Sequence, residues 1–441
     1  MKSIRILIFA ALALAVCSCG IYGKYKPQMT QDEEDALLAS VPSYRNIFKE
    51  PELLELIDTA LANNFDLRMA HERVHQADLQ LTAAKLAYLP RIFAGGSPVA
   101  TVNPSGAVDF SKLSYNLGSA SWEIDIFGRT TNKKRIAQSV RDQVADFEQA
   151  ARAELVAAVA TTYYSLLMLD AQIAATDSAE ANWSSSVKAI RAMKEAGLED
   201  EAAVSQFEGS YYATRASGKS LRLLREATEN SMRVLLSCDT CTIRRGVMAS
   251  DIESRIDVGT VSGLSLNAVR IRPDVRAAEM QLAQSFHNVN LARANCCPDI
   301  SIGGAVGWAN GNLIFSLVGN LLQPVFNAGA NITQVKVSKS QLEEYQMAYA
   351  NALLKAGTEV NNAVASIKSY RSQVEDYSNR VEAMQRALMA TQLKMKYGRG
   401  TYLEVLTAQN NLLDAQIDNI QNTADILISV VDLFQALGGC R

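Results

Sequence analysis

The amino-acid sequence predicts a mainly α-helical protein with a minority of β-strands, built as two copies of one plan. The chain has 441 residues but only 24 Gly and 9 Pro, too few for a turn-rich chain, and this favours long helices. Apolar residues make up 48% and charged residues 20%, enough to build a core. A motif also recurs 208 residues further on with its spacing kept, pairing Asp66 with Asp274, Arg68 with Arg276 and Ala70 with Ala278, which indicates a duplicated domain.

The first residues have the features of an export signal. Lys2 and Arg5 precede an apolar run over residues 6–16, which is too short to span a bilayer comfortably. The small residue Ser18 before Cys19 resembles the cleavage boundary of a bacterial lipoprotein signal. We therefore expect a signal peptide over residues 1–18 and a lipidated N-terminal extension over residues 19–50. Cys17 is a competing anchor, and ordinary secretion without a lipid is the alternative. No transmembrane helix is expected after the signal.

Each copy is expected to contain the same elements in the same order. A first helix ends before a proline, which cannot continue it easily. Strand-like segments follow, then a very long helix that runs to a glycine, and then a second helix. Each very long helix would measure on the order of 100 Å. The copies are predicted over 51–240 and 268–437, with a connector at 241–267 and a tail at 438–441. Within them, the first helices are predicted at 58–88 and 268–296, and the very long helices at 130–196 and 330–397.

The helices on either side of each glycine have apolar residues at alternating spacings of three and four. Such heptads joined by a short Gly turn predict an antiparallel coiled-coil hairpin. We match Gly197 of the first copy with Gly400 of the second and expect both to be turn residues with a positive φ. The heptad positions include Trp183, Val187, Ile190, Val204 and Phe207 in the first copy, and Leu388, Met395, Leu403, Leu406 and Leu413 in the second.

Four segments have the alternation of β-strands, at 91–96, 113–121, 299–307 and 312–322, with a polar loop over 97–111. The alternation changes phase at Ser121–Trp122, which predicts either a bulge or a strand that leaves one environment for another. Four strands cannot close a barrel, and an open edge in lipid leaves unpaired amides. Either several chains share one barrel, three chains giving twelve strands, or the strands form a soluble pair of hairpins. Trp122, Trp308 and Tyr115 are candidates for interfacial aromatic belts, with ordinary packing as the alternative.

These residues together resemble the TolC-like outer-membrane efflux proteins, in particular the lipoprotein branch that serves RND-type drug pumps. The resemblance covers nearly the whole chain after the signal, in family order. It rests on these motifs: Cys19-Gly20, residues 66–70 with 273–278, the stretch Trp122-Glu123-Ile124-Asp125-Ile126-Phe127-Gly128-Arg129, its partner at 323–329, residues 196–198, residues 397–401 and residues 436–439.

The resemblance implies a homotrimer whose twelve strands form one β-barrel in the outer membrane, continued by a long α-helical barrel in the periplasm. Such a channel conducts drugs or other small molecules passively, with a periplasmic adaptor and an inner-membrane RND transporter as partners and outer-membrane lipid around it. It is not an enzyme and needs no cofactor or metal; only three His are present. The formal net charge of −3 argues against nucleic acid as a partner. The alternatives are an exit duct for type I protein secretion and a lipid-anchored coiled-coil scaffold.

The family narrows its periplasmic end with side chains just after the second Gly turn, often a ring of aspartates. The matching stretch, residues 402–409, offers Glu404, Thr407 and Leu403 as gate candidates. Thr407 stands where the family has Asp, so Glu404 is the carboxylate candidate, with a solvated helix face as the alternative. By the same resemblance, Gly197, Leu198, Arg399, Gly400 and Thr401 are candidates for contact with the adaptor at the hairpin tips, with a solvated tip as the alternative.

The motif Cys238-Asp239-Thr240-Cys241 lies at the expected end of a helix. In an oxidising periplasm it predicts a structural disulfide between Cys238 and Cys241. A thiol oxidoreductase is the enzyme-class alternative, but the strand–CxxC–helix context that it requires is missing.

Overall fold

The computed structural model describes residues 23–30, 32–33, 36–37, 43–102, 108–248, 255, 266–309, 312–322 and 329–439. The predicted signal peptide and Cys19 lie outside these residues. The chain forms two compact units. The strand unit comprises residues up to Thr30, Ala70–Phe147 and Asp274–Ala352, and the hairpin unit comprises Gln31–Met69, Glu148–Pro273 and Leu353–Arg441. Each unit therefore takes segments from both sequence copies.

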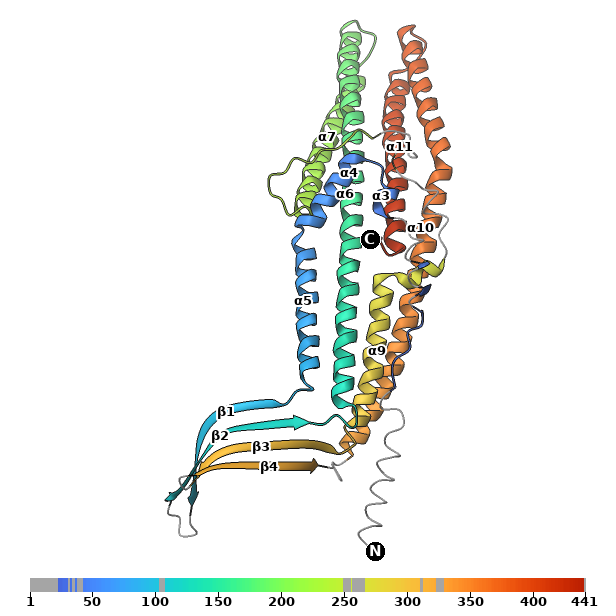
Figure 1. Ribbon diagram of the computed structural model, residues 1–441. Helices are drawn as coiled ribbons and strands as arrows, with labels where there is room; N and C mark the ends of the chain where they lie inside the picture. The colour runs from blue at the N-terminus through green and yellow to red at the C-terminus, as the bar shows by residue number, and fades with distance from the viewer. Residues whose placement is uncertain are drawn as a thin grey trace. The chain divides into compact units, whose positions relative to one another are not determined.

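The strand unit contains one antiparallel sheet in the order β1-β2-β3-β4 (Figure 1). The strands are β1 Arg91–Val102, β2 Val108–Glu123, β3 Asp299–Ala309 and β4 Asn312–Leu322. All four predicted strands are confirmed. The predicted loop over 97–111 is wrong, because β1 and β2 extend into it. The alternation there is obscured by the run Gly95-Gly96-Ser97-Pro98. The register of β1 shifts between Ala94 and Ser97, so a bulge accommodates the two glycines, while Ser97 and Pro98 are paired with β2.

The predicted bulge in β2 exists, but it lies earlier than expected. The register between β2 and β3 shifts between Asn116 and Gly118 rather than at Ser121–Trp122. The extra residue, Leu117, reverses the phase of the alternation, so that Gly118, Ala120 and Trp122 share one face. The small residues at 118–120 delayed the visible change of phase in the sequence until Trp122.

Directly opposite residues share a face of a sheet, so the register assigns every position in the sheet. The face that carries Trp122 is almost entirely apolar, and we call it the apolar face. It includes Ile92, Ala120, Trp122, Ile302, Val306, Trp308, Leu313, Phe315, Leu317 and Leu321. The opposite face, which we call the polar face, mixes serines and an asparagine with a few apolar residues. It includes Phe93, Ser119, Ser121, Ser301, Ala305, Ile314, Ser316, Val318 and Asn320.

The first helix of each copy is broken, which corrects the predicted continuous helices over 58–88 and 268–296. In the first copy, α4 Pro51–Asn63 and α5 Phe65–Leu86 meet at Asn64, which has a non-helical ψ of 127°. The Asn64 side chain accepts a hydrogen bond from the Leu67 amide at 2.9 Å and caps α5. In the second copy, the 3₁₀ helix η1 Leu266–Ile271 precedes α9 Pro273–Ala294. Pro273 disfavours helical backbone at the residue before it. A short helix, α3 Tyr44–Ile47, precedes α4.

Two helical pairs make up the long α-helical part of the chain, α6 Arg129–Glu195 with α7 Glu201–Leu235, and α10 Ala330–Lys396 with α11 Tyr402–Ala436 (Figure 1). The first helix of each pair has 67 residues and the second has 35, so the two copies match in length. One window of α6 is apolar and long enough to cross a membrane, but 61% of that window is buried within the structure, as in a core helix.

The seam of the first pair confirms the heptad prediction. Trp183, Ile190 and Phe207 are about 1% exposed, and the rings of Trp183 and Phe207 meet edge to face at 5.7 Å. Both pairs contribute to this cluster in the hairpin unit, because Val405 of α11 is one of its buried members. In α10 the heptad residues Leu388 and Met395 are only partly buried against it.

In each copy, a side chain at the break in the first helix donates a hydrogen bond to the last residue of the last helix, and we call this hydrogen bond a clasp. Asn64 donates through its amide to the carbonyl oxygen of Leu235 at 2.9 Å. Arg272 donates from its guanidinium to the carbonyl oxygen of Ala436 at 2.8 Å. Asn64 and Arg272 are separated by the 208 residues of the sequence repeat. These clasps satisfy carbonyls that the last turn of a helix leaves without partners.

Candidate functional site at the hairpin tips

Both helical pairs turn through the same backbone motif. At the end of α6, Leu198 donates to the carbonyl of Met193 at 2.9 Å, and Gly197 adopts a φ of +72°. At the end of α10, Arg399 donates to the carbonyl of Lys394 at 2.9 Å, and Gly398 adopts a φ of +69°. This is the Schellman arrangement, in which glycine supplies the left-handed residue. The equivalent of Gly197 is therefore Gly398, and the predicted match with Gly400 is wrong.

Gly400 has a different reason to be glycine. Its φ is not positive, but a Cβ there would lie 3.0 Å from the Cβ of Lys394 and 3.1 Å from the amide nitrogen of Met395. Close backbone approach, rather than left-handed geometry, therefore favours glycine at this position.

The residue before each returning helix is an N-cap. The Asp200 side chain accepts from the amide of Ala203 at 2.9 Å, and the Thr401 hydroxyl accepts from the amide of Glu404 at 3.4 Å. Thr401 thus has a structural role in addition to its predicted place at the tip. Leu198 is 70% exposed and Arg399 is also exposed, so both are accessible to a partner.

The three gate candidates lie together on one exposed face of α11. Leu403 is 53% exposed, and Glu404 and Thr407 are also exposed. Residues spaced by three and four share a helix face, and the opposite face buries Val405 and Ala408.

The heptad prediction is therefore wrong at Leu403, because the tip of α11 turns Val405 toward the core. The exposed face continues to Asp414, a second carboxylate that the sequence prediction missed. Asp414 lies seven residues after Thr407, a spacing that returns to the same side of a helix.

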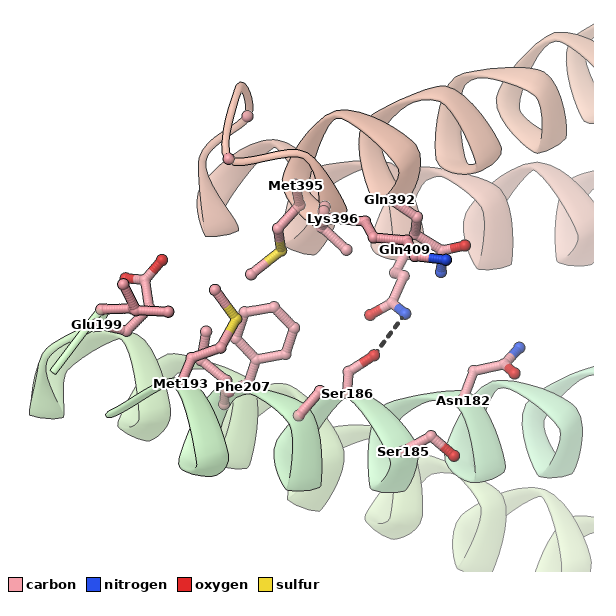
Figure 2. A pocket seen from close by; sticks show the side chains of 16 residues that line it. Asn182, Ser185, Ser186, Met193, Glu199, Phe207, Gln392, Met395, Lys396 and Gln409 are labelled. Carbon is pink, nitrogen blue, oxygen red and sulfur yellow. Dashed lines mark hydrogen bonds between the residues drawn. The ribbon is translucent and has the colours of Figure 1, made fainter. Parts of the chain in front are cut away.

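A groove of about 830 Å³ separates the tips of the two helical pairs. Met193 of α6 and Met395 of α10 point toward each other across it, with Phe207 beside them (Figure 2). Deeper in the groove, the Gln409 amide of α11 donates to the Ser186 hydroxyl of α6 at 2.9 Å. Gln409 is only 6% exposed, and its carboxamide oxygen has no hydrogen-bond partner in the structure. The sequence analysis did not single out Gln409, because no apolar periodicity signals a buried amide.

The thiols of Cys238 and Cys241 are free in the structure, so the predicted disulfide is not formed there. A hydrogen bond from the Cys241 side chain lowers the pKa of the Cys238 thiol, and burial raises the pKa of Cys241. Among the residues that the structure describes, no group of three or more His, Cys, Asp or Glu side chains could hold a metal ion.

The sheet and the helical pairs define a class of protein, the membrane channels that combine β-strands with long helical hairpins. The model of the outer membrane efflux protein family matches residues 56–237 and 264–439, and the chain belongs to this family. The two matched segments correspond to the two sequence copies, one segment for each. The chain is accordingly a non-enzymatic efflux channel of the outer membrane that extends into the periplasm, as the sequence predicted.

Characterised relatives align over almost the whole chain. The toluene efflux pump outer membrane protein TtgC of Pseudomonas putida is 27% identical over 433 residues, covering 94% of this chain and 88% of that protein. The cation efflux system protein CusC of Escherichia coli K12 is 25% identical and covers all of both chains. A crystal structure of CusC matches with a TM-score of 0.83 over 90% of this chain and 94% of that one, at 24% identity. The open-state structure of the Neisseria gonorrhoeae MtrE channel matches with a TM-score of 0.81 over 95% of this chain and 97% of that one, also at 24% identity. These structural matches establish the fold.

Proposed function

We propose that the chain works as a homotrimer, in which three four-stranded sheets close one twelve-stranded barrel and the helical pairs line a shared duct. The observation that carries this proposal is the sheet itself. Within the part of the chain that the structure describes, the outer edges of β1 and β4 have no strand partner. Each unpaired backbone group costs several kcal/mol in hydrocarbon. Pairing β1 of one protomer with β4 of the next would leave no strand edge of the sheet unpaired.

The two faces of the sheet support a barrel wall in lipid. Leu317 and Phe315 on the apolar face are 82% and 72% exposed in the single chain, as expected of side chains that meet lipid. Trp122 and Trp308 lie on the same face. Trp122 is opposite Ile302, so the two tryptophans are separated by six residues along β3, or about 20 Å. That separation suits two interfacial aromatic belts, and the serines of the polar face would then line the water-filled interior.

The hairpin tips are the proposed contact for a periplasmic adaptor, which links the duct to an inner-membrane RND transporter. The relatives' names support such an assembly, since TtgC is called part of an efflux pump and CusC part of a cation efflux system. The exposed Leu198 and Arg399 are accessible at the tips. The proposed cargo is drugs or other small molecules rather than a secreted protein.

The lipid anchor at Cys19 is part of the proposal. Residues shortly after it pack onto the strand unit. The Gly23 carbonyl accepts from Arg135 of α6 at 3.1 Å, and the Gln28 amide donates to Glu279 of α9 at 2.7 Å. Because Gly23 is only four residues from Cys19, this packing keeps the anchor within about 14 Å of the strand unit. Cys19→Ser should remove labelling by radioactive palmitate while the protein is still exported.

The decisive experiment measures the mass of the extracted assembly and its conductance in planar bilayers, and it then compares two matched substitutions in the sheet. Native mass spectrometry of the detergent-extracted protein should give a trimer, and planar bilayers should show stable channels. A scaffold would give no conductance, and a secretion duct would co-purify with an ABC exporter instead of an RND pump.

Leu317→Arg places a charge on the lipid side, where it costs about 2–4 kcal/mol, and should prevent insertion. Ser316→Arg places the same charge one residue away, on the polar face, and should insert normally with altered conductance. Equal behaviour of the two variants would refute the assignment of the faces.

A further inference from the structure

Helix α5 carries two exposed histidines that lie one helical turn apart. His71 and His75 are both exposed and both lie in the interior of this helix. Residues four apart on a helix are neighbours, with about 5–6 Å between their Cβ atoms. Each histidine directly follows a residue of the buried stripe, which consists of Ala70, Val74, Ala77 and Leu81. The two imidazoles therefore share one side of the helix, next to its buried stripe and open to solvent.

The N-terminal segment, residues 23–30, covers the equivalent side of α9 in the second copy. The Gln28 amide donates to the Glu279 carboxylate at 2.7 Å, and the Asn290 side chain donates to the Gly23 carbonyl oxygen at 3.3 Å. As a result, Glu279 is only 8% exposed and Asn290 only 2%. This side of α9 is therefore occupied by the chain itself.

The two copies differ in chemistry as well as in access at these positions. At the repeat offset of 208 residues, His71 corresponds to Glu279 and His75 corresponds to Ala283. Ala283 is 3% exposed, whereas both histidines are exposed. The first copy thus presents two imidazoles to solvent where the second copy buries a carboxylate and a methyl group.

Two imidazoles at this spacing are a chelating pair for a transition-metal ion. Histidines at positions i and i+4 of one helix face hold Zn²⁺ in the H-E-x-x-H motif of metalloproteases, and residues 71–75 match that pattern. A metalloprotease also needs a third protein ligand. Across the described part of the chain, no three His, Cys, Asp or Glu side chains are grouped to hold a metal. Asp78, the next residue on this side, pairs with Arg141 of α6 at 2.9 Å. The two histidines are therefore suited to binding an ion, with water in its remaining positions, rather than to hydrolysis.

We infer that His71 and His75 form a surface site for a divalent transition-metal ion of the Ni²⁺, Cu²⁺ and Zn²⁺ group. Imidazole suits these ions, and the affinity of such sites rises along the series to Cu²⁺. Mg²⁺ requires oxygen ligands and is excluded. The bound ion joins two successive turns of α5 and stabilises the helix that precedes β1. The inference goes beyond the proposed function and does not depend on the oligomeric state, because both ligands come from one helix.

The test is a titration of the untagged, full-length protein in detergent with Ni²⁺, followed by isothermal titration calorimetry. Ni²⁺ is the probe because Cu²⁺ would also oxidise cysteine thiols. His71→Gln and His75→Gln should each bind Ni²⁺ about 100 times more weakly than the wild type, because the second of two linked ligands acts at a high effective concentration. Excess Mg²⁺ should leave the wild-type affinity unchanged, and loss of Ni²⁺ binding to Mg²⁺ would contradict an imidazole site.

The matched control exchanges two neighbouring residues. The double variant His75→Gln with Gln76→His keeps the composition and the number of histidines, and Gln76 is exposed, so the fold should be retained. It moves the second imidazole to position i+5, about 140° around the helix from His71. This variant should bind Ni²⁺ as weakly as His71→Gln, and saturating Ni²⁺ should raise the midpoint of thermal unfolding of the wild type alone. Equal affinity of the wild type and the exchange variant, including an absence of binding in both, would overturn the inference.

Discussion

The substitution Gly439→Ala tests the packing of the residues after α11 against Ala153 of α6. Gly439 has a φ of +51°, and a Cβ there would overlap the side chain of Ala153 and lie 2.8 Å from its Cα. The left-handed backbone alone costs a non-glycine residue about 1 kcal/mol. Forcing a methyl group into filled space adds about 1–3 kcal/mol. Gly439→Ala should therefore destabilise the hairpin unit by about 2–4 kcal/mol.

Gly197→Ala is the matched control. Gly197 has a similar φ of +72°, but a Cβ there would meet nothing within 4 Å. It should lose only the backbone contribution of about 1 kcal/mol. Denaturant unfolding of the detergent-solubilised protein, followed by far-UV circular dichroism, measures both. If the two variants lose the same stability, the close approach of Gly439 to Ala153 does not exist in solution, and the packing described for the end of α11 is incorrect.

Three further substitutions test the gate, a buried histidine and the clasp. Glu404→Ala should raise single-channel conductance and reduce cation preference in planar bilayers, since a ring of three carboxylates attracts cations and narrows the path; an unchanged current–voltage relation would assign Glu404 to a solvated helix face. His287 is buried, and burial, reinforced by Arg135, lowers its pKa from 6.5 to about 4. The unfolded chain then binds the proton more readily, so stability that is present above pH 6.5 is lost as the pH falls, by about 2–3 kcal/mol at pH 4.5. His287→Gln should flatten this part of the dependence of the free energy of unfolding on pH. An unaltered slope would exclude His287 as its source. Asn64→Ala removes both a helix cap and the hydrogen bond to Leu235, and it should lower the free energy of unfolding by about 1–2 kcal/mol. Asn63→Ala, at the exposed neighbouring residue, should lower it little. A comparable loss of stability in both variants would argue against the clasp.

The sequence predicted the long helices well because their signals are local. The very long helices α6 and α10 begin and end within a residue of the predicted bounds, since apolar spacing and a terminal glycine both mark them. The breaks at Asn64 and Arg272 were missed, because each interrupts an apolar pattern that continues on both sides. At these positions one cap, or one proline, overrides helical propensity.

The site was only partly predictable for a related reason. The family pattern offered Glu404 and the tips as candidates, whose roles stay predictions, and the structure adds that the three gate candidates share one exposed face. The family pattern could not identify Gln409, because its hydrogen bond is to a distant residue of α6. It also could not distinguish Gly398 from Gly400 within a short turn that contains both glycines. Contacts between copies leave no local trace in the chain, so only the folded arrangement shows them.

The matching closures of the two copies have a consequence for symmetry. In the proposed homotrimer, six helical pairs surround the axis, whereas a chain with only one copy would need six identical subunits to build the same ring. Joining two copies in one chain, with equal helix lengths and equivalent clasps at Asn64 and Arg272, would keep this sixfold arrangement and lower the true symmetry to threefold. Alternate positions around the ring are then free to diverge, and a partner can distinguish odd positions from even ones without any change in the scaffold.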